Sequence, residues 1–229
     1  MLYLVPTPIG NLEDITVRAL DVLKTVDYIL AEDTRKTSIL LRHYDIDART
    51  TSYHQHNEKK KLQAVLSHLK EGKKVALVSE AGMPGISDPG FLLVRACIEE
   101  DIVVSSLPGP NALTSALVAS GLPSDHFYFA GFLPHKKGRN KKWEDLASRE
   151  ETMIVYESPY RIDKFLMECE KYTGPDRLIC IAREMTKIHE EYIRGTVSEI
   201  RSSLEDRDPL KGEMVVVIAG KGYSPARES

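Results

Sequence analysis

The sequence has three cysteines, one tryptophan and no long apolar run, and each scarcity excludes a class of protein. The cysteines, Cys97, Cys169 and Cys180, are far apart and odd in number. We therefore interpret them as reduced, buried thiols of a cytoplasmic protein, not as disulfides or metal ligands. No apolar run approaches the ~20 residues that a membrane span requires. Hydrophobic residues make up 42% of the chain and charged residues 28%, which is typical of a globular protein with a sizeable core.

Two nucleotide-binding signatures are also missing. The first apolar segment is not followed by the G-x-G-x-x-G spacing of a dinucleotide fingerprint, and no Walker A loop occurs in the chain. A nicotinamide oxidoreductase is therefore disfavoured. The net charge of −3 excludes a uniformly basic nucleic-acid coat, so any contact with RNA must come from a local patch.

The chain does contain a dense group of glycines and prolines after a short apolar segment. Residues 74–79 are rich in valine and favour a strand buried on both faces. Five glycines and prolines follow between residues 82 and 90, before a helical pattern begins at Phe91. Glycine lets a ligand approach the backbone, and proline restricts the shape of a loop. A buried strand, such a loop and a helix are typical of the ligand-binding crevice of an α/β domain, although a simple tight connection is the alternative.

Strand and helix patterns alternate through the first half, which predicts a parallel α/β sheet. The apolar recurrence of Val17, Leu20 and Leu23 indicates a helix that Asp14 caps. Residues 121–125 form a linker, so we place one domain at residues 1–120 and a second α/β domain at residues 121–229. The expected strands are 2–6, 28–31, 49–53, 74–79, 102–107, 127–133, 152–156, 178–182, 190–194 and 214–219.

Polar residues gather where several of these strands end, and such ends face one crevice in an open α/β sheet. The groups are Glu32 to Arg35, Glu80 to Asp88, Glu157 to Arg161 and Arg183 to Lys187. Each group alone is also explained by a helix cap or a surface ion pair. His54 and His56 resemble a metal pair, but no third and fourth ligand is apparent, so we expect no metal site.

A basic run lies between the aromatic segment 127–133 and Trp143, which we expect to open a helix. Its five cations fall within seven residues: Lys136, Lys137, Arg139, Lys141 and Lys142. A solvated loop is one explanation. Positive charge beside aromatic residues also suits a phosphate backbone and stacked bases.

Several motifs resemble those of the ribosomal RNA small-subunit methyltransferase I family, in the tetrapyrrole-methylase-like class. The family's central loop usually reads Ser-Asp-Ala-Gly-Thr-Pro, whereas this chain has Glu80 and Met83 at the Asp and Thr positions. The charge survives at Glu80, and Met83 lacks the hydroxyl. The motifs are Tyr3 to Thr16, Glu32 to Arg35, Tyr53 to Glu58, Ser79 to Gly90, Pro108 to Leu117, Glu157 to Arg161 and Arg183 to Glu190.

The resemblance implies two α/β/α domains, with S-adenosylmethionine in the cleft between them and a homodimer as the assembly. It implies 2′-O-methylation of a cytidine in the decoding region of 16S ribosomal RNA, with the RNA or the small ribosomal subunit as partner. Two other readings stay open: a methyltransferase for a small tetrapyrrole-like molecule, and a non-catalytic RNA-binding assembly factor.

The resemblance also implies roles for individual residues. The methyl donor would contact Pro8, Ile9, Ala81, Gly82, Met83, Pro84, Ile86, Ser87, Asn111, Ala112, Tyr156, Glu157, Arg183 and Gly212. RNA would contact Arg35, His54, His56, Arg161 and the five cations of the basic run. Asp33, Glu80 and Lys187 are the candidates for a general base, because burial in a closed site raises the basicity of a carboxylate and removes the charge of a lysine.

Overall fold

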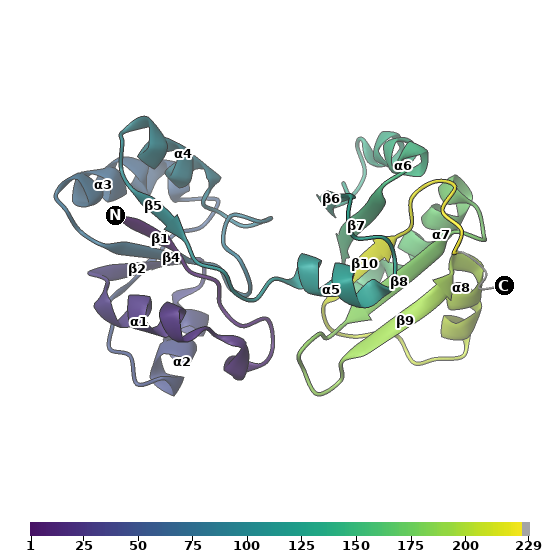
Figure 1. Ribbon diagram of the computed structural model, residues 1–229, viewed down its shortest axis with the longest axis horizontal. Helices are drawn as coiled ribbons and strands as arrows, with labels where there is room; N and C mark the ends of the chain where they lie inside the picture. Colours follow the sequence, from purple (N-terminus) through teal and green to yellow (C-terminus); the bar gives the residue numbers. More distant parts are fainter. Residues whose placement is uncertain (226–229) are drawn as a thin grey trace. The chain divides into compact units, whose positions relative to one another are not determined.

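The structure is a computed structural model that describes residues 1–225, and these form two α/β units (Figure 1). The first unit is Met1–Asn111 and the second begins at Ala112. The sequence placed this boundary nine residues later, after residue 120. The difference is helix α5 (Ala112–Ser120), which packs against strands β8 (Leu178–Arg183) and β10 (Met214–Ile218) of the second unit.

The first unit is a five-stranded, wholly parallel sheet between two layers of helices, as the alternating pattern predicts. Its strands, in the spatial order β3-β2-β4-β1-β5, are Thr50–Ser52, Tyr28–Ala31, Val75–Val78, Leu2–Leu4 and Val104–Ser106. Its helices are α1 (Val17–Thr25), α2 (Thr34–His43), α3 (Glu58–Lys70) and α4 (Phe91–Glu99). Helices α1 and α2 cover one face and α3 and α4 the other, each with its own apolar core (Figure 1).

The start of α1 differs from the prediction. Asp14 ends a short 3-10 turn, and Thr16 is the residue that caps the helix, because its hydroxyl accepts a hydrogen bond from the amide of Ala19 at 3.1 Å. Ala19 and Leu23 then face the core, while Val17 is exposed. Threonine and aspartate are both good N-caps, so composition alone does not choose between them.

The second unit is a mixed sheet in the order β6-β7-β10-β8-β9. Strands β6 (Phe127–Phe132) and β7 (Thr152–Glu157) are parallel, and every other pairing is antiparallel, including that of β9 (Glu191–Thr196) with β8. Helices α6 (Arg139–Ser148), α7 (Ile162–Thr173) and α8 (Val197–Glu205) contribute to one apolar core. Helix α8 begins with a capping box, in which the side chains of Thr196 and Glu199 each bond the other's backbone amide.

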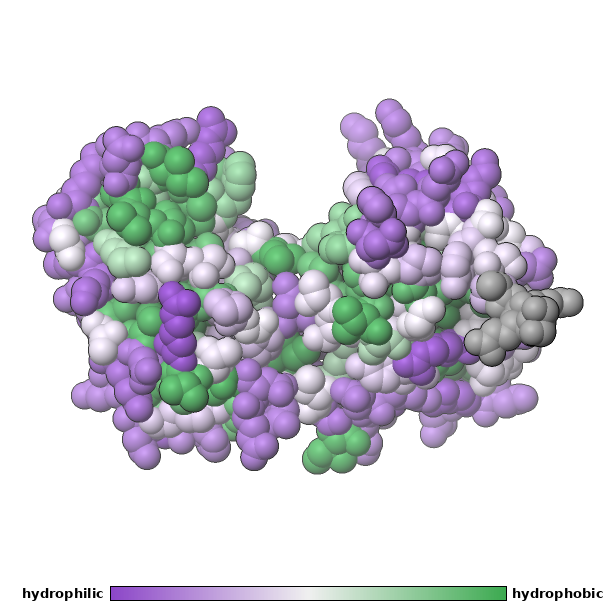
Figure 2. Space-filling view, viewed as in Figure 1, coloured by the Kyte–Doolittle hydropathy of each residue, from purple (hydrophilic) through white to green (hydrophobic). Residues whose placement is uncertain are grey.

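Helix α6 begins four residues before the predicted start. Trp143 is a fully buried residue within the helix and not its first residue. On the face that Figure 2 shows, hydrophilic residues and separate apolar patches lie on both units. Among the described residues, no helix is both long and apolar enough to cross a bilayer.

Candidate functional site

The first sheet has a topological switch point between β1 and β4. The two strands are parallel neighbours, but the chain leaves β1 towards α1 on one face of the sheet and leaves β4 towards α4 on the other face (Figure 1). The loops that follow such strands diverge and leave a crevice at the carboxyl edge, which is where open α/β sheets bind ligands. The glycine- and proline-rich loop lies at this edge, as the sequence predicts.

Three loops pack together at the switch point. The amides of Thr7 and Gly82 each donate to the carbonyl of the other residue, at 3.0 and 2.8 Å, so the loop after β1 is pinned to the loop after β4. The loop after β5 joins them at Gly109, where an added Cβ would lie 2.9 Å from the Cβ of Pro6. The Ser106 hydroxyl also contacts the Met83 sulfur at 3.9 Å. The site is therefore a group of three loops that contact one another.

Backbone conformation explains the residues of the long loop. Gly82, Gly85 and Gly90 have φ of 78°, 85° and 141°, a region that side chains rarely adopt. Ser87 is also left-handed, with φ of 65°. An added Cβ at Gly90 would lie 2.9 Å from the Leu77 side chain, whereas nothing lies within 4 Å of one at Gly85. The loop is thus packed tightly at Gly90 and open at Gly85.

An acidic cluster, formed by Glu32, Glu80 and Asp88, lies beside these loops. Burial, with smaller contributions from the neighbouring charges of Glu32 and Glu80, raises the pKa of Asp88 to about 7 against the opposing effect of a hydrogen bond with Ser79. Burial and the charge of Glu80 likewise raise the pKa of Glu32. Strands β2 and β4 are adjacent, which brings these carboxyl groups together. Burial and the neighbouring carboxylates therefore both favour the protonated form of Asp88.

The structure argues against Asp33 as a proton acceptor. Its carboxylate accepts the backbone amide of Arg35 at 2.9 Å and the guanidinium of the same residue at 2.8 and 3.1 Å. These hydrogen bonds lower the pKa of Asp33 to about 2. Asp33 is the N-cap of α2, so its position at the end of β2 has a structural explanation. Glu80 is exposed and paired with Lys36.

The structure also argues against Lys187 as a base. Burial lowers its pKa, but hydrogen bonds to Glu184 at 2.8 Å and Glu213 at 3.1 Å outweigh burial, and the pKa is raised. The sequence-based expectation that burial removes the lysine's charge is therefore wrong. Gly212 is left-handed, and an added Cβ would lie 2.2 Å from the Glu184 side chain. That side chain already occupies the space over Gly212 where a cofactor was expected.

A buried ion network occupies several predicted positions of the second unit. Arg139 is 4% exposed and contacts the Glu168 carboxylate at 2.6 Å, which also accepts the Trp143 indole N–H at 3.0 Å. Glu157 is 3% exposed and pairs with Arg161 at 2.8 Å. Arg139 is therefore no part of a solvent-facing RNA patch, and the Glu157 carboxylate is engaged within the protein.

The remaining predicted contacts fall into two groups. Lys142 is half-buried against Tyr128 and Asp145, at 2.6 and 3.1 Å, and Arg183 bonds Glu191 on β9. The exposed residues are Arg35, His56, Lys136, Lys137 and Lys141. His54 is half-buried, and its ring Nε2 lies 3.0 Å from the side-chain Nδ2 of Asn57.

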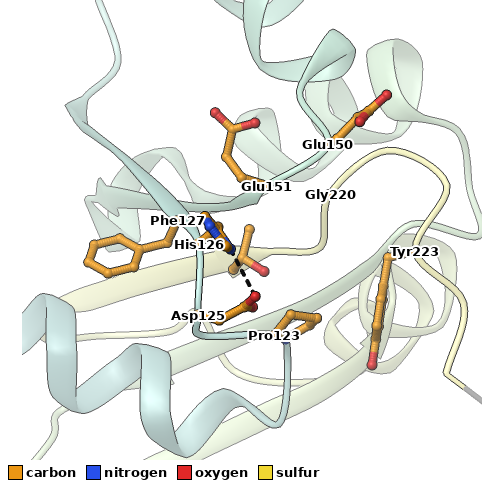
Figure 3. A pocket seen from close by; sticks show the side chains of 9 residues that line it. Pro123, Asp125, His126, Phe127, Glu150, Glu151, Gly220 and Tyr223 are labelled. Atoms are coloured by element: carbon orange, nitrogen blue, oxygen red, sulfur yellow. Dashed lines mark hydrogen bonds and ion pairs between the residues drawn. The ribbon is translucent and has the colours of Figure 1, made fainter.

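A hollow of about 700 Å³ lies where β6 and β7 begin, beside their first residues, Phe127 and Thr152 (Figure 3). Its lining contains Asp125, Glu150 and Glu151 and none of the predicted site residues. The only base in the lining, His126, is paired with Asp125 at 2.8 Å (Figure 3). An acidic lining repels phosphate, so this hollow is not part of an RNA-binding surface.

Comparisons with known proteins agree with this geometry. The profile of the family described as Tetrapyrrole (Corrin/Porphyrin) Methylases matches residues 1–201. The ribosomal RNA small subunit methyltransferase I of Thermotoga maritima is 51% identical over 220 residues, which cover 96% of this chain and 98% of that protein. The protein of the same name from a Hydrogenobaculum species is 49% identical over 95% of both chains. The chain belongs to the ribosomal RNA small subunit methyltransferase I family of tetrapyrrole methylases.

Solved structures show how widely this methylase fold is shared. A cobalt precorrin-4 methyltransferase has a TM-score of 0.69 and 18% identity, and covers 95% of this chain and 94% of its own. The methyltransferase CobJ has a TM-score of 0.68 and 20% identity, with 99% and 96% covered. These identities support the fold alone. The resemblance of the motifs to the family and the predicted fold class are both confirmed.

Asp88 is the residue of this methylase that sequence reasoning failed to select as a candidate base. It belongs to the long loop, and its position after Ser87 was visible in the sequence. Its environment was not, because Glu32 lies 56 positions earlier in the chain and reaches Asp88 only through the pairing of β2 with β4.

Proposed function

We propose that this methylase transfers a methyl group from S-adenosylmethionine to the 2′-hydroxyl of a cytidine in the decoding region of 16S ribosomal RNA. The observation that carries the proposal is the identity of about half, over nearly the whole chain, with relatives named for ribosomal RNA methylation. The position of three packed loops at a switch point supports it. A substrate of this kind supports a cytoplasmic location, which is part of the proposal.

The residues of the first unit fit this methyl donor. Ile9, Met83 and Ile86 are half-buried apolar side chains suited to the adenosine moiety, and the open backbone at Gly85 leaves room for a ligand. S-Adenosylmethionine supplies a methyl group on a positively charged sulfur, and the acidic cluster provides a complementary charge. Pro8, Ala81, Gly82, Pro84, Ser87 and Asn111 stay predicted contacts in this unit, and Ala112, Tyr156 and Arg183 in the second.

In this proposal the loops supply positioning and Asp88 accepts a proton. Holding the 2′-oxygen in line with the methyl carbon accounts for about 7–11 kcal/mol of the barrier. As the oxygen–carbon bond forms, the carbon–sulfur bond breaks and the hydroxyl proton passes to the Asp88 carboxylate. The products are the methyl ether, a neutral thioether and protonated Asp88, so charge and protons balance. A pKa near the working pH is what general base catalysis requires.

The proposal is tested by mapping ribosomal RNA from cells with and without the gene for this chain. We expect one cytidine of the small-subunit RNA to lose a ribose methyl group when the protein is absent, and to regain it when the protein is restored. An unchanged RNA together with a changed tetrapyrrole would establish the small-molecule reading. Binding of the cofactor without transfer to any ribosomal particle would establish the non-catalytic one.

The assembly is part of the same proposal. The family resemblance implies a homodimer, and light scattering of the purified chain measures its mass directly. We expect twice the chain mass of 25.7 kDa, and a mass of one chain at working concentrations would remove the dimer from the proposal.

A further inference from the structure

Three aromatic rings form a cluster on the β6–β7 edge of the second sheet. The ring of Tyr156 meets the ring of Phe129 at a centroid distance of 5.0 Å and the ring of Phe132 at 5.4 Å, both in edge-on geometry. Phe132 is nonetheless 58% exposed. The Phe132 ring is therefore held by its neighbours and still presents an aromatic surface to solvent.

The strand pattern places these rings away from the helical core. Tyr128 and Ala130 pack against the core that α6, α7 and α8 share with the sheet, so Phe129 points to the other face. The register of β6 with β7 shifts between Phe129 and Gly131, and this irregularity keeps Phe132 on the same face as Phe129. Helix α5 packs against β10 and β8, which come after β6 and β7 in the order of the sheet.

Exposed positive charge follows this cluster directly. Lys136 and Lys137 occupy the turn after β6 and are exposed. Four residues span at most about 14 Å of chain, so Lys136 lies close to Phe132 in any conformation of the turn. An aromatic face beside cations matches a single nucleic-acid strand, in which bases and phosphates alternate.

We infer that Phe132 stacks on an unpaired base of the RNA substrate, with Lys136 and Lys137 on the neighbouring phosphates. This inference rests on the proposed function and adds that the recognised RNA segment is single-stranded. Bases within a duplex are stacked on one another and present no free face to a side chain. Tyr156 and Phe129 act as positioning residues that hold the Phe132 ring through edge contacts.

The test compares Phe132→Ala with Phe132→Tyr and with Met167→Ala. Met167 is the matched control because it is an equally exposed apolar side chain of the same unit, at 58%, on helix α7. The measured quantities are binding of a labelled single-stranded oligoribonucleotide, binding of the matching duplex, and binding of S-adenosylmethionine by calorimetry. We expect Phe132→Ala to weaken single-strand binding about 5- to 100-fold, and Phe132→Tyr and Met167→Ala to retain it.

Other outcomes overturn the inference. Equal losses for Phe132→Ala and Met167→Ala would mean that general surface apolarity is responsible. A loss of S-adenosylmethionine binding with unchanged RNA binding would assign the ring to the methyl donor. Equal binding of duplex and single strand would remove the stacking. If the unaltered protein binds RNA but transfers no methyl group, the proposed function fails while the stacking stands.

The charge component has its own measurement. Each phosphate contact with a single strand contributes about 0.7 to the slope of log affinity against log salt. Replacing Lys136 and Lys137 together by Ser should therefore reduce that slope by about 1.4, with the effect of Phe132→Ala unchanged. An unaltered slope would show that these lysines do not contact the strand.

Discussion

At the scale of single residues, position in the sequence is a poor guide to the role of a charge. Arg139 and Lys136 are three residues apart in one basic run, yet Arg139 is buried against Glu168 and Lys136 is exposed. A buried charge must be paired, because the loss of its hydration is costly. The run therefore contains structural and surface cations side by side. The residue that makes Arg139 structural is Glu168, which lies 29 residues further along the chain.

Removal of Arg139 should destabilise the second unit. We expect Arg139→Ala to cost about 3–5 kcal/mol of unfolding free energy, because Glu168 is left with a partly buried, uncompensated charge. Lys136→Ala is the control from the same run and should stay within about 0.5 kcal/mol. Denaturant titration followed by the fluorescence of Trp143, the only tryptophan, reports on this unit. Similar costs for both variants would contradict the buried network.

The second prediction at this scale concerns Asp88 and pH. Methyl transfer should rise with pH and level off above about 7, because the carboxylate must be deprotonated to accept the proton. Asp88→Asn keeps the shape and the contact with Ser79 and should lower the rate about 10²–10⁴-fold while cofactor affinity is retained. A normal rate, or a rate loss matched by the loss of cofactor binding, would exclude Asp88 as the base.

The same pKa determines how Asp88 affects stability. The folded state raises the pKa of Asp88 from the ordinary range of an aspartate to about 7, so its stabilising contribution is complete below the ordinary range and is lost as pH rises through about 7. Asp88→Asn should therefore stabilise the protein more at pH 8 than at pH 5, by about 1–2 kcal/mol after allowance for solvent screening. Thermal unfolding at the two pH values measures this difference, and the reverse order would contradict the buried acidic cluster.

At the scale of elements, local patterns predicted what local forces determine. The strand Tyr28–Ala31 has the predicted bounds. The errors lie where tertiary contacts decide between equal local options. Helix α6 begins at Arg139, whose guanidinium is bound by Glu168 of α7. No periodicity within α6 indicates such a partner.

The long loop provides a prediction at this scale. Gly90→Ala should cost about 2–4 kcal/mol, because the backbone is left-handed and the new Cβ meets the Leu77 side chain at 2.9 Å. Gly72→Ala is the control, since its φ is 87° but nothing lies within 4 Å of the added atom. We expect a cost of about 1 kcal/mol there. Equal costs in thermal unfolding would show that packing at Gly90 is not tight.

At the scale of the whole molecule, the sequence predicted two α/β units but not their composition. Helix α5 was assigned to the first unit because a linker follows it, yet Arg194 of β9 bonds the carbonyls of Ala119 and Ser120 at 2.6 and 3.3 Å. These bonds satisfy the carboxyl end of α5 and join it to the second unit. Such contacts link residues about 75 positions apart, so no local pattern reports them.

Function at this scale follows from combining features that are weak alone. The glycine-rich loop indicated a ligand crevice, and the strand order established the switch point at which it lies. The acidic cluster became visible only when β2 and β4 were adjacent. The substrate class came from the resemblance of the motifs, because the geometry of either unit alone does not indicate it. The central claim is therefore the transfer of a methyl group from S-adenosylmethionine to ribosomal RNA.

The most direct test is transfer of a labelled methyl group in vitro. Purified protein is incubated with labelled S-adenosylmethionine and small ribosomal subunits from cells that lack the protein, and the labelled nucleotide is located by nuclease digestion and mass analysis. We predict one label per subunit, on the ribose of a cytidine, with none on subunits from unaltered cells. Label on a base, or no label on RNA while the cofactor binds, would contradict the account.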